Sequence, residues 1–113
     1  MTSPLKQNSW DPALIEKRWR NSLEKGRHAI DQLGKSLTGT SPGFYVLCLA
    51  EVDAVASFNW AKCFVSRAAF ITELRRLIAE PTTPSRPVPS LQAYRESQKW
   101  FLEMEIKQCE ANT

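Results

Sequence analysis

The sequence predicts an all-α protein: a small bundle of three or four helices that a second copy of the chain completes by homodimerisation. Apolar residues recur at helical spacing over long stretches. The alternation typical of strands is absent, and so are Asn-Gly and Asp-Gly hairpin turns. An acceptor residue followed by proline, typical of a helix start, occurs at Asp11-Pro12 and again at Ser41-Pro42. At 113 residues, with 42% hydrophobic side chains, the chain has the size and composition of one globular domain.

The first helix is predicted over about 12–37. Asp11 is placed to accept hydrogen bonds from free backbone N–H groups, and Pro12 loses no bond at the first helical position. One apolar stripe follows at steps of three and four residues: Trp19, Leu23, Gly26, Ile30, Leu33 and Leu37. We expect residues 1–9 to be a disordered tail and residues 10–113 to form a single helical domain.

The second helical segment is predicted over 42–79, and its length leaves two alternatives open. Its apolar residues surround the helix axis, and its polar residues fall on one face about 120° wide. Ser57 and Asn59 carry side chains that compete for backbone hydrogen bonds. The segment is therefore either one long helix or two helices broken near 57–59.

Four prolines define a connector over 81–89. No helix or central strand survives that density, so we expect an extended, semi-rigid segment. Ser90 then caps a last helix, predicted over 90–109.

Two flanking helices cover only part of a central segment that is apolar on most sides. Self-association would cover the rest, which predicts a homodimer. The expected seam between the two copies consists of Val52, Val55, Trp60 and Phe64. The alternative is a compact monomer in which a break near Asn59 lets the two halves of the segment fold back on each other.

The net charge of +3 lies entirely in residues 1–40, which hold seven basic and four acidic residues. Amide, basic and histidine side chains recur there at helical spacing opposite the apolar stripe: Arg18, Asn21, Lys25, His28, Gln32 and Lys35. This basic face has three interpretations: a solvated surface, a binding site for nucleic acid, or a binding site for an acidic protein.

The sequence predicts no catalytic, metal or cofactor site. His28 is the only histidine, and it lies on the polar side of the first helix. The cysteines Cys48, Cys63 and Cys109 match no zinc-ligand spacing. Their odd number and apolar surroundings are typical of free thiols in a reducing compartment, which predicts a cytoplasmic protein.

Charged residues inside the most apolar stretch, 44–65, argue against a membrane span. One of them, Asp53, lies on the apolar side of the predicted helix. A buried pair between Asp53 and Arg75 or Arg67 would fix the register of the bundle.

We therefore expect a non-enzymatic helical adaptor, regulatory subunit or assembly subunit that acts through protein–protein contacts. Its partners would be a second copy of itself and another protein. The alternative is a nucleic-acid-binding regulator or nucleoprotein subunit that uses the basic face of the first helix.

Overall fold

The computed structural model describes residues 10–35 and 42–111 and shows an all-α fold in these ranges. The tail expected over 1–9 lies outside the described residues. The helices, in chain order, are α2 (Pro12–Lys35), α3 (Pro42–Ser57), α4 (Trp60–Cys63), α5 (Arg67–Ala79) and α6 (Leu91–Ala111).

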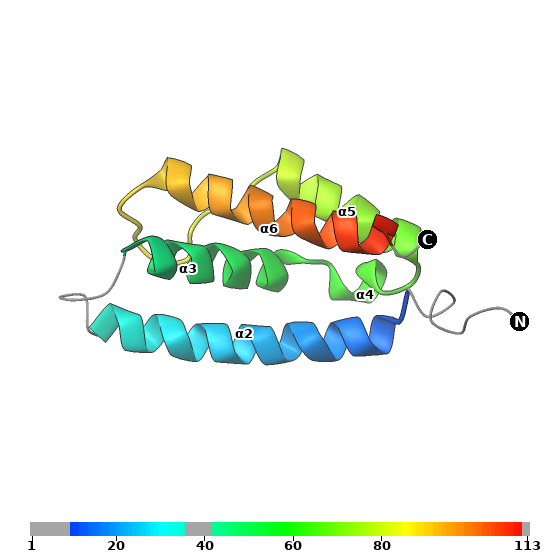
Figure 1. Ribbon diagram of the computed structural model, residues 1–113, viewed down its shortest axis with the longest axis horizontal. Coiled ribbons are helices and arrows are strands. Elements are labelled where there is room, and N and C mark those ends of the chain that lie inside the picture. The colour runs from blue at the N-terminus through cyan, green and yellow to red at the C-terminus, as the bar shows by residue number, and fades with distance from the viewer. Residues whose placement is uncertain (1–9, 36–41, 112–113) are drawn as a thin grey trace, which may run out of the picture.

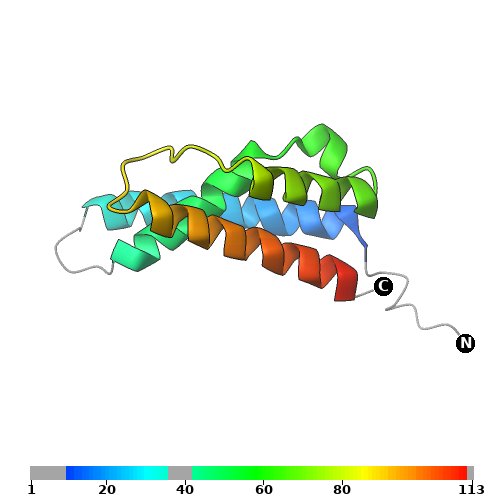
Figure 2. The ribbon, with the colours of Figure 1, turned by 90° about the horizontal axis from the view of Figure 1, so that it is seen from above.

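The helix α3 lies in the middle of the bundle. As Figure 1 shows, α2 runs antiparallel along one side of α3, and α6 runs parallel to α3 along the other. The helix α5 packs against α6, and α4 turns the chain between α3 and α5 (Figures 1 and 2). The flanking helices α2 and α6 therefore pack apolar sides against α3, which lies between them.

The start of α2 follows the local signal in the sequence. Oδ1 of Asp11 accepts hydrogen bonds from the backbone N–H groups of Ala13 (3.1 Å) and Leu14 (3.3 Å). Further along, Trp19 and Ile30 are buried on the side of α2 that faces α3. From Trp19 to Ile30 the expected stripe therefore forms the α2 side of the core, whereas the side chain of Leu33 and all of Leu37 lie outside the described residues.

The segment expected over 42–79 is interrupted twice, so the expectation of three or four helices is wrong for the described residues, which form five. The first interruption lies at Phe58 and Asn59, where Glu73 of α5 accepts a hydrogen bond from the backbone N–H of Asn59 (3.1 Å). The second precedes Ser66, whose Oγ accepts a hydrogen bond from the backbone N–H of Ala69 (3.1 Å) and caps α5. The chain folds back at these two points.

This reversal covers most of the apolar surface that suggested a dimer. Trp19 packs among the rings of Phe58, Trp60, Phe64 and Phe70, with ring centroids 4.4 to 6.2 Å apart. Of the expected seam, Val52 and Val55 are buried inside the single chain. Trp60 and Phe64 are half-buried and pack against the core of the same chain. The seam was expected because one chain was predicted to leave these four side chains uncovered, and the structure shows that one chain covers them in large part. Dimerisation itself stays a prediction.

Buried polar side chains fix the proline-rich connector to the bundle. Asp53 of α3 accepts hydrogen bonds from the backbone N–H of Ser85 (3.0 Å), the hydroxyl of Ser85 (2.6 Å) and the hydroxyl of Tyr94 (2.7 Å). Gln98 of α6 accepts from the backbone N–H of Thr82 (3.2 Å) and donates to the Ala50 carbonyl of α3 (3.0 Å). The partners of Asp53 are therefore the connector and α6, so the possible pairing with Arg75 or Arg67 is not formed and Asp53 is buried.

Candidate protein-binding surfaces

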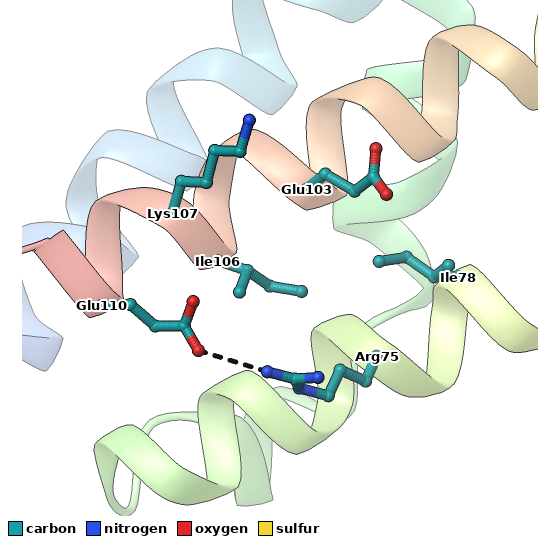
Figure 3. A pocket seen from close by; sticks show the side chains of 6 residues that line it. All are labelled: Arg75, Ile78, Glu103, Ile106, Lys107 and Glu110. Atoms are coloured by element: carbon teal, nitrogen blue, oxygen red, sulfur yellow. Dashed lines mark hydrogen bonds and ion pairs between the residues drawn. The ribbon is translucent and has the colours of Figure 1, made fainter.

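A groove runs along the seam between α5 and α6 (Figure 3). It has a volume of about 440 Å³. Ile78 of α5 and Ile106 of α6 project between the two helices and form its apolar floor. Its rim consists of Arg75, Glu103, Lys107 and Glu110.

The groove continues toward the start of α6. A second hollow of about 300 Å³ shares Ile78 with the first and is bounded by Pro81, Leu91 and the first two turns of α6. Leu91 is 44% exposed, which adds an apolar surface at this end. The two hollows together form one amphipathic channel, which we call the α5–α6 groove.

The polar rim of the α5–α6 groove carries four basic and three acidic side chains, a net charge of +1. Arg75 and Glu110 form an ion pair across one end (3.2 Å; Figure 3), and Gln92 donates a hydrogen bond to Glu96 at the other (3.0 Å). Three basic side chains of α6 on this rim have no hydrogen bond or ion pair within the described residues: Arg95, Lys99 and Lys107. Of the rim carboxylates in the described part of the chain, only Glu103 is likewise unpaired. The rim therefore favours a ligand with negative charge.

A second candidate surface lies where α2, α3 and α6 are side by side (Figure 1), and we call it the three-helix face. Phe44, Leu47, Cys48 and Glu51 of α3 lie on one side of that helix because they are three, one and three residues apart. Glu51 interacts electrostatically with both Arg18 of α2 and Glu105 of α6. Glu51 therefore lies between the two flanking helices.

Exposed apolar side chains occur on both α3 and α6. Trp100 and Met104 of α6 are one turn apart and are 57% and 37% exposed, and Met104 directly precedes Glu105. On α3, Phe44 is 53% exposed and Leu47 is half-buried. On α3, Glu51 therefore shares its side of the helix with the exposed ring of Phe44 and the half-buried Leu47.

The charges on the three-helix face are unevenly satisfied. Both oxygens of Glu105 accept hydrogen bonds from the guanidinium of Arg18, at 2.9 and 3.0 Å. Glu51 has no hydrogen-bond partner among the described residues, and burial, together with the neighbouring charge of Glu105, raises the pKa of its carboxyl. Arg18 opposes that rise. An additional cation would stabilise the ionised form of Glu51.

The structure divides the basic face expected on the first helix. Arg18 is bound to Glu105, whereas Asn21, Lys25, His28 and Gln32 are exposed. The side chain of Lys35 lies outside the described residues. The exposed part of this row lies on the side of α2 opposite the apolar stripe and forms the outer, α2 edge of the three-helix face, and within the described residues Arg18 is the member of the row that interacts with Glu51.

The cysteine thiols are protonated at neutral pH. Burial raises the pKa of Cys63 and of Cys109 to about 11 and also raises that of the half-buried Cys48. Within residues 10–35 and 42–111, no three His, Cys, Asp or Glu side chains are grouped so that they could hold a metal ion. In the same ranges, no helix is both long and apolar enough to cross a bilayer.

In comparisons with protein families, curated proteins and solved structures, no match to this chain was found. The surfaces described above therefore carry the functional assignment. Sequence reasoning located one edge of the three-helix face but missed the α5–α6 groove. The spacing of Arg95 and Lys99, four residues apart on the last helix, was the available signal.

Proposed function

We propose that this chain is a non-enzymatic helical adaptor, regulatory or assembly subunit that holds an acidic amphipathic helix of another protein in the α5–α6 groove. The observation that carries this proposal is the combination of an apolar floor with unpaired bases on its rim. Ile78, Leu91 and Ile106 provide the apolar surface, and Arg95 and Lys99 provide the nearest positive charge.

A helix suits this groove better than a small ligand does. Two parallel ridges with an apolar floor accept a third helix, which inserts side chains at steps of three and four residues. The groove is long and open, because its two hollows join end to end at Ile78. A small molecule would instead need an enclosed pocket that covers most of its surface.

Contact without catalysis is further supported by how the polar groups of the core are used. Asp53 and Gln98 are occupied by the connector, and the thiols of Cys63 and Cys109 are protonated and buried. His28 is exposed on α2. Free buried thiols also fit a reducing compartment, so we propose a cytoplasmic location.

The alternative function is nucleic-acid binding by the α2 edge of the three-helix face. Exposed Lys25 and His28 favour it. Two facts count against it: Arg18 is engaged by Glu105, and the ionised carboxyl of Glu51 would repel a phosphate chain. Binding to a polyanion would weaken steeply with salt, whereas an acidic amphipathic helix would lose only the part of its affinity that comes from charge and would keep its apolar contacts.

The test measures binding of three designed helical peptides by titration calorimetry. All three carry the same leucine stripe, and their flanks are acidic, neutral or basic. The acidic peptide should bind most tightly. In the chain, Arg95→Glu combined with Lys99→Glu should remove this preference, because it reverses the charge of the groove rim.

The matched control is Lys17→Glu combined with Arg27→Glu, which makes the same charge change at exposed positions on α2. The control should bind the acidic peptide as the parent does, apart from a small loss from the change in net charge. If the control loses binding and the groove variant keeps it, the binding site lies on α2 and the proposal is wrong. Duplex DNA that binds tightly at low salt and is released when the salt concentration is raised would instead favour the nucleic-acid alternative.

A further inference from the structure

The ion pair between Arg75 and Glu110 spans one end of the α5–α6 groove with a weak contact. One terminal nitrogen of Arg75 on α5 donates to Glu110 on α6 at 3.2 Å (Figure 3). Both side chains are more than half exposed, 62% for Arg75 and 53% for Glu110. Exposed ion pairs contribute little to stability, so another carboxylate can take the place of one partner at little cost.

Arg75 retains donors for a second carboxylate. A guanidinium carries five N–H donors, and within the described residues Arg75 uses one of them, in its bond to Glu110. The guanidinium of Arg18, in contrast, donates to both oxygens of Glu105 at 2.9 and 3.0 Å. Two parallel bonds of that kind are the stronger arrangement. A ligand carboxylate that engages Arg75 with both oxygens would therefore bind it better than Glu110 does.

The bases of the groove lie at two separate ends. Arg95 and Lys99 line the hollow near the start of α6, and Arg75 lies beside Glu110 near its end. Lys99 and Glu110 are 11 residues apart on α6. At about 1.5 Å per residue, this separation is roughly 16 Å, or about three helical turns. A helix bound along the groove can therefore reach both ends.

The middle of the rim has the opposite preference. Glu103 lies between the two ends and is unpaired within the described part of the chain. A carboxylate of a bound helix would be repelled there, and it would be attracted at either end. The favourable ligand thus has its negative charges apart and not in one central cluster.

We propose that the partner helix carries acidic side chains at both ends of its apolar stripe, and that one of them displaces Glu110 from Arg75. The other acidic end faces Arg95 and Lys99, about three turns away. This inference rests on the proposed function of the groove. It adds Arg75 as a second anchor for the ligand, which Glu110 masks in the free chain.

The test compares two designed helical peptides with the same amino-acid composition, net charge and leucine stripe. The two-ended peptide carries its acidic side chains in two pairs about three turns apart, and the centred peptide carries all of them in the middle. Titration calorimetry gives both dissociation constants. The two-ended peptide should bind the parent chain about three-fold more tightly, because the acids of the centred peptide face Glu103.

Glu110→Gln should tighten binding of the two-ended peptide by about three-fold, because Arg75 then has no competing carboxylate. The centred peptide should gain far less. Arg75→Gln should remove the advantage of the two-ended peptide, and Glu110→Gln should then have little further effect. The matched control is Glu24→Gln, which makes the same charge change at an exposed position on α2 and should leave both constants near those of the parent. Circular dichroism checks that each variant is folded.

The outcomes separate this inference from the proposed function. If the parent binds neither peptide, the proposed function is wrong and the inference falls with it. If the parent binds both peptides equally well, or if Glu110→Gln tightens both alike, the groove is a binding site but Arg75 is not a masked anchor. A gain from Glu110→Gln that persists in the Arg75→Gln background would also overturn the inference, because Glu110 would then repel the peptide directly.

Discussion

Arg18 and Glu105, 87 positions apart in the sequence, form a two-pronged ion pair that joins α2 to α6 across α3. Glu105 is buried, with 7% of its side chain exposed, whereas Arg18 is about half exposed. The guanidinium of Arg18 therefore offsets the free-energy cost of burying the charge of Glu105. The same two hydrogen bonds fix the position of the arginine side chain. A residue expected to face a ligand is thus part of the framework of the bundle.

Arg18→Ala should destabilise the fold, because it leaves the buried carboxylate of Glu105 without its cation. We expect a loss of about 2 kcal/mol in the free energy of unfolding, measured by urea denaturation. Lys25→Ala, at an exposed position on the same helix, should change stability by less than about 0.5 kcal/mol. An equal, small effect of both variants would show that the pair contributes nothing.

Glu51→Gln should stabilise the monomer at neutral pH. The pKa of Glu51 is raised by burial and by Glu105, so the folded state favours its protonated form. The protonated carboxyl of Glu51 contributes fully to stability below pH 4.5, the ordinary pKa of a glutamate. This contribution is lost as the pH rises through the higher pKa of Glu51 in the folded state. The measurement is the free energy of unfolding against pH.

At pH values above the folded pKa of Glu51, the glutamine variant should therefore have a larger free energy of unfolding than its parent. Its free energy of unfolding should also fall less as the pH rises. Glu103→Gln, at an exposed position of α6, is the matched control and should change the profile little. If Glu51→Gln is less stable than its parent at neutral pH, the ionised carboxylate of Glu51 has a stabilising partner within the chain.

The parts of the fold that the sequence indicates are those set by local chemistry. Asp11 caps α2 through its nearest neighbours, and Ser90 caps α6 by accepting from the backbone N–H of Ala93 (3.1 Å). Prolines keep the connector out of helical structure wherever the rest of the chain lies. Ser66 was missed because a serine fits an exposed helical position as well as a cap, and only the packing of α5 selects the cap.

The contacts that define the surfaces were not predictable because they join distant positions. Asp53 lies 32 residues before Ser85, and nothing local indicates that a buried carboxylate will accept from a connector in place of an arginine. The row containing Arg18 was visible as a pattern, but its partner on α6 depends on how three helices pack. Periodicity identifies the faces of a helix, and it does not reveal what lies opposite each face.

Gly26→Ala should destabilise the fold although alanine is the better helix former. A Cβ atom at Gly26 would overlap Cγ2 of Val52, so α2 and α3 approach each other closely only because this position lacks a side chain. The gain in helix propensity is about 1 kcal/mol, and we expect the overlap to exceed it by about 1 kcal/mol. Urea denaturation of the single variant measures the balance.

The double variant separates the two contributions. In a Val52→Ala background the obstructing methyl group is absent, so Gly26→Ala should then stabilise the chain relative to Val52→Ala alone. If Gly26→Ala stabilises the parent as well, α2 and α3 shift apart at little cost and the close approach is not required for the fold.

Tyr94 should ionise only at strongly alkaline pH, and the fold should weaken when it does. Burial raises the pKa of its phenol to about 12, to which the hydrogen bond to Asp53 contributes. In a Tyr45→Phe variant, ultraviolet absorbance reports Tyr94 alone, and the midpoint of phenolate formation should lie near pH 12. Because the folded value exceeds the ordinary value of 10, stability from this group is complete below 10 and is lost as pH rises through 12.

Tyr94→Phe tests the same contact without a change of pH. Asp53 would retain both hydrogen bonds from Ser85 but would lose the one from the phenol, and Thr82 would lose its contact with that oxygen. We expect a loss of about 2 kcal/mol in the free energy of unfolding, against little change for Tyr45→Phe. Proteolysis should cut the connector of the Tyr94→Phe chain faster than that of the parent, because one of its anchors is gone. Equal cleavage rates would show that the remaining contacts, of Ser85 with Asp53 and of Thr82 with Gln98, are enough to hold the connector.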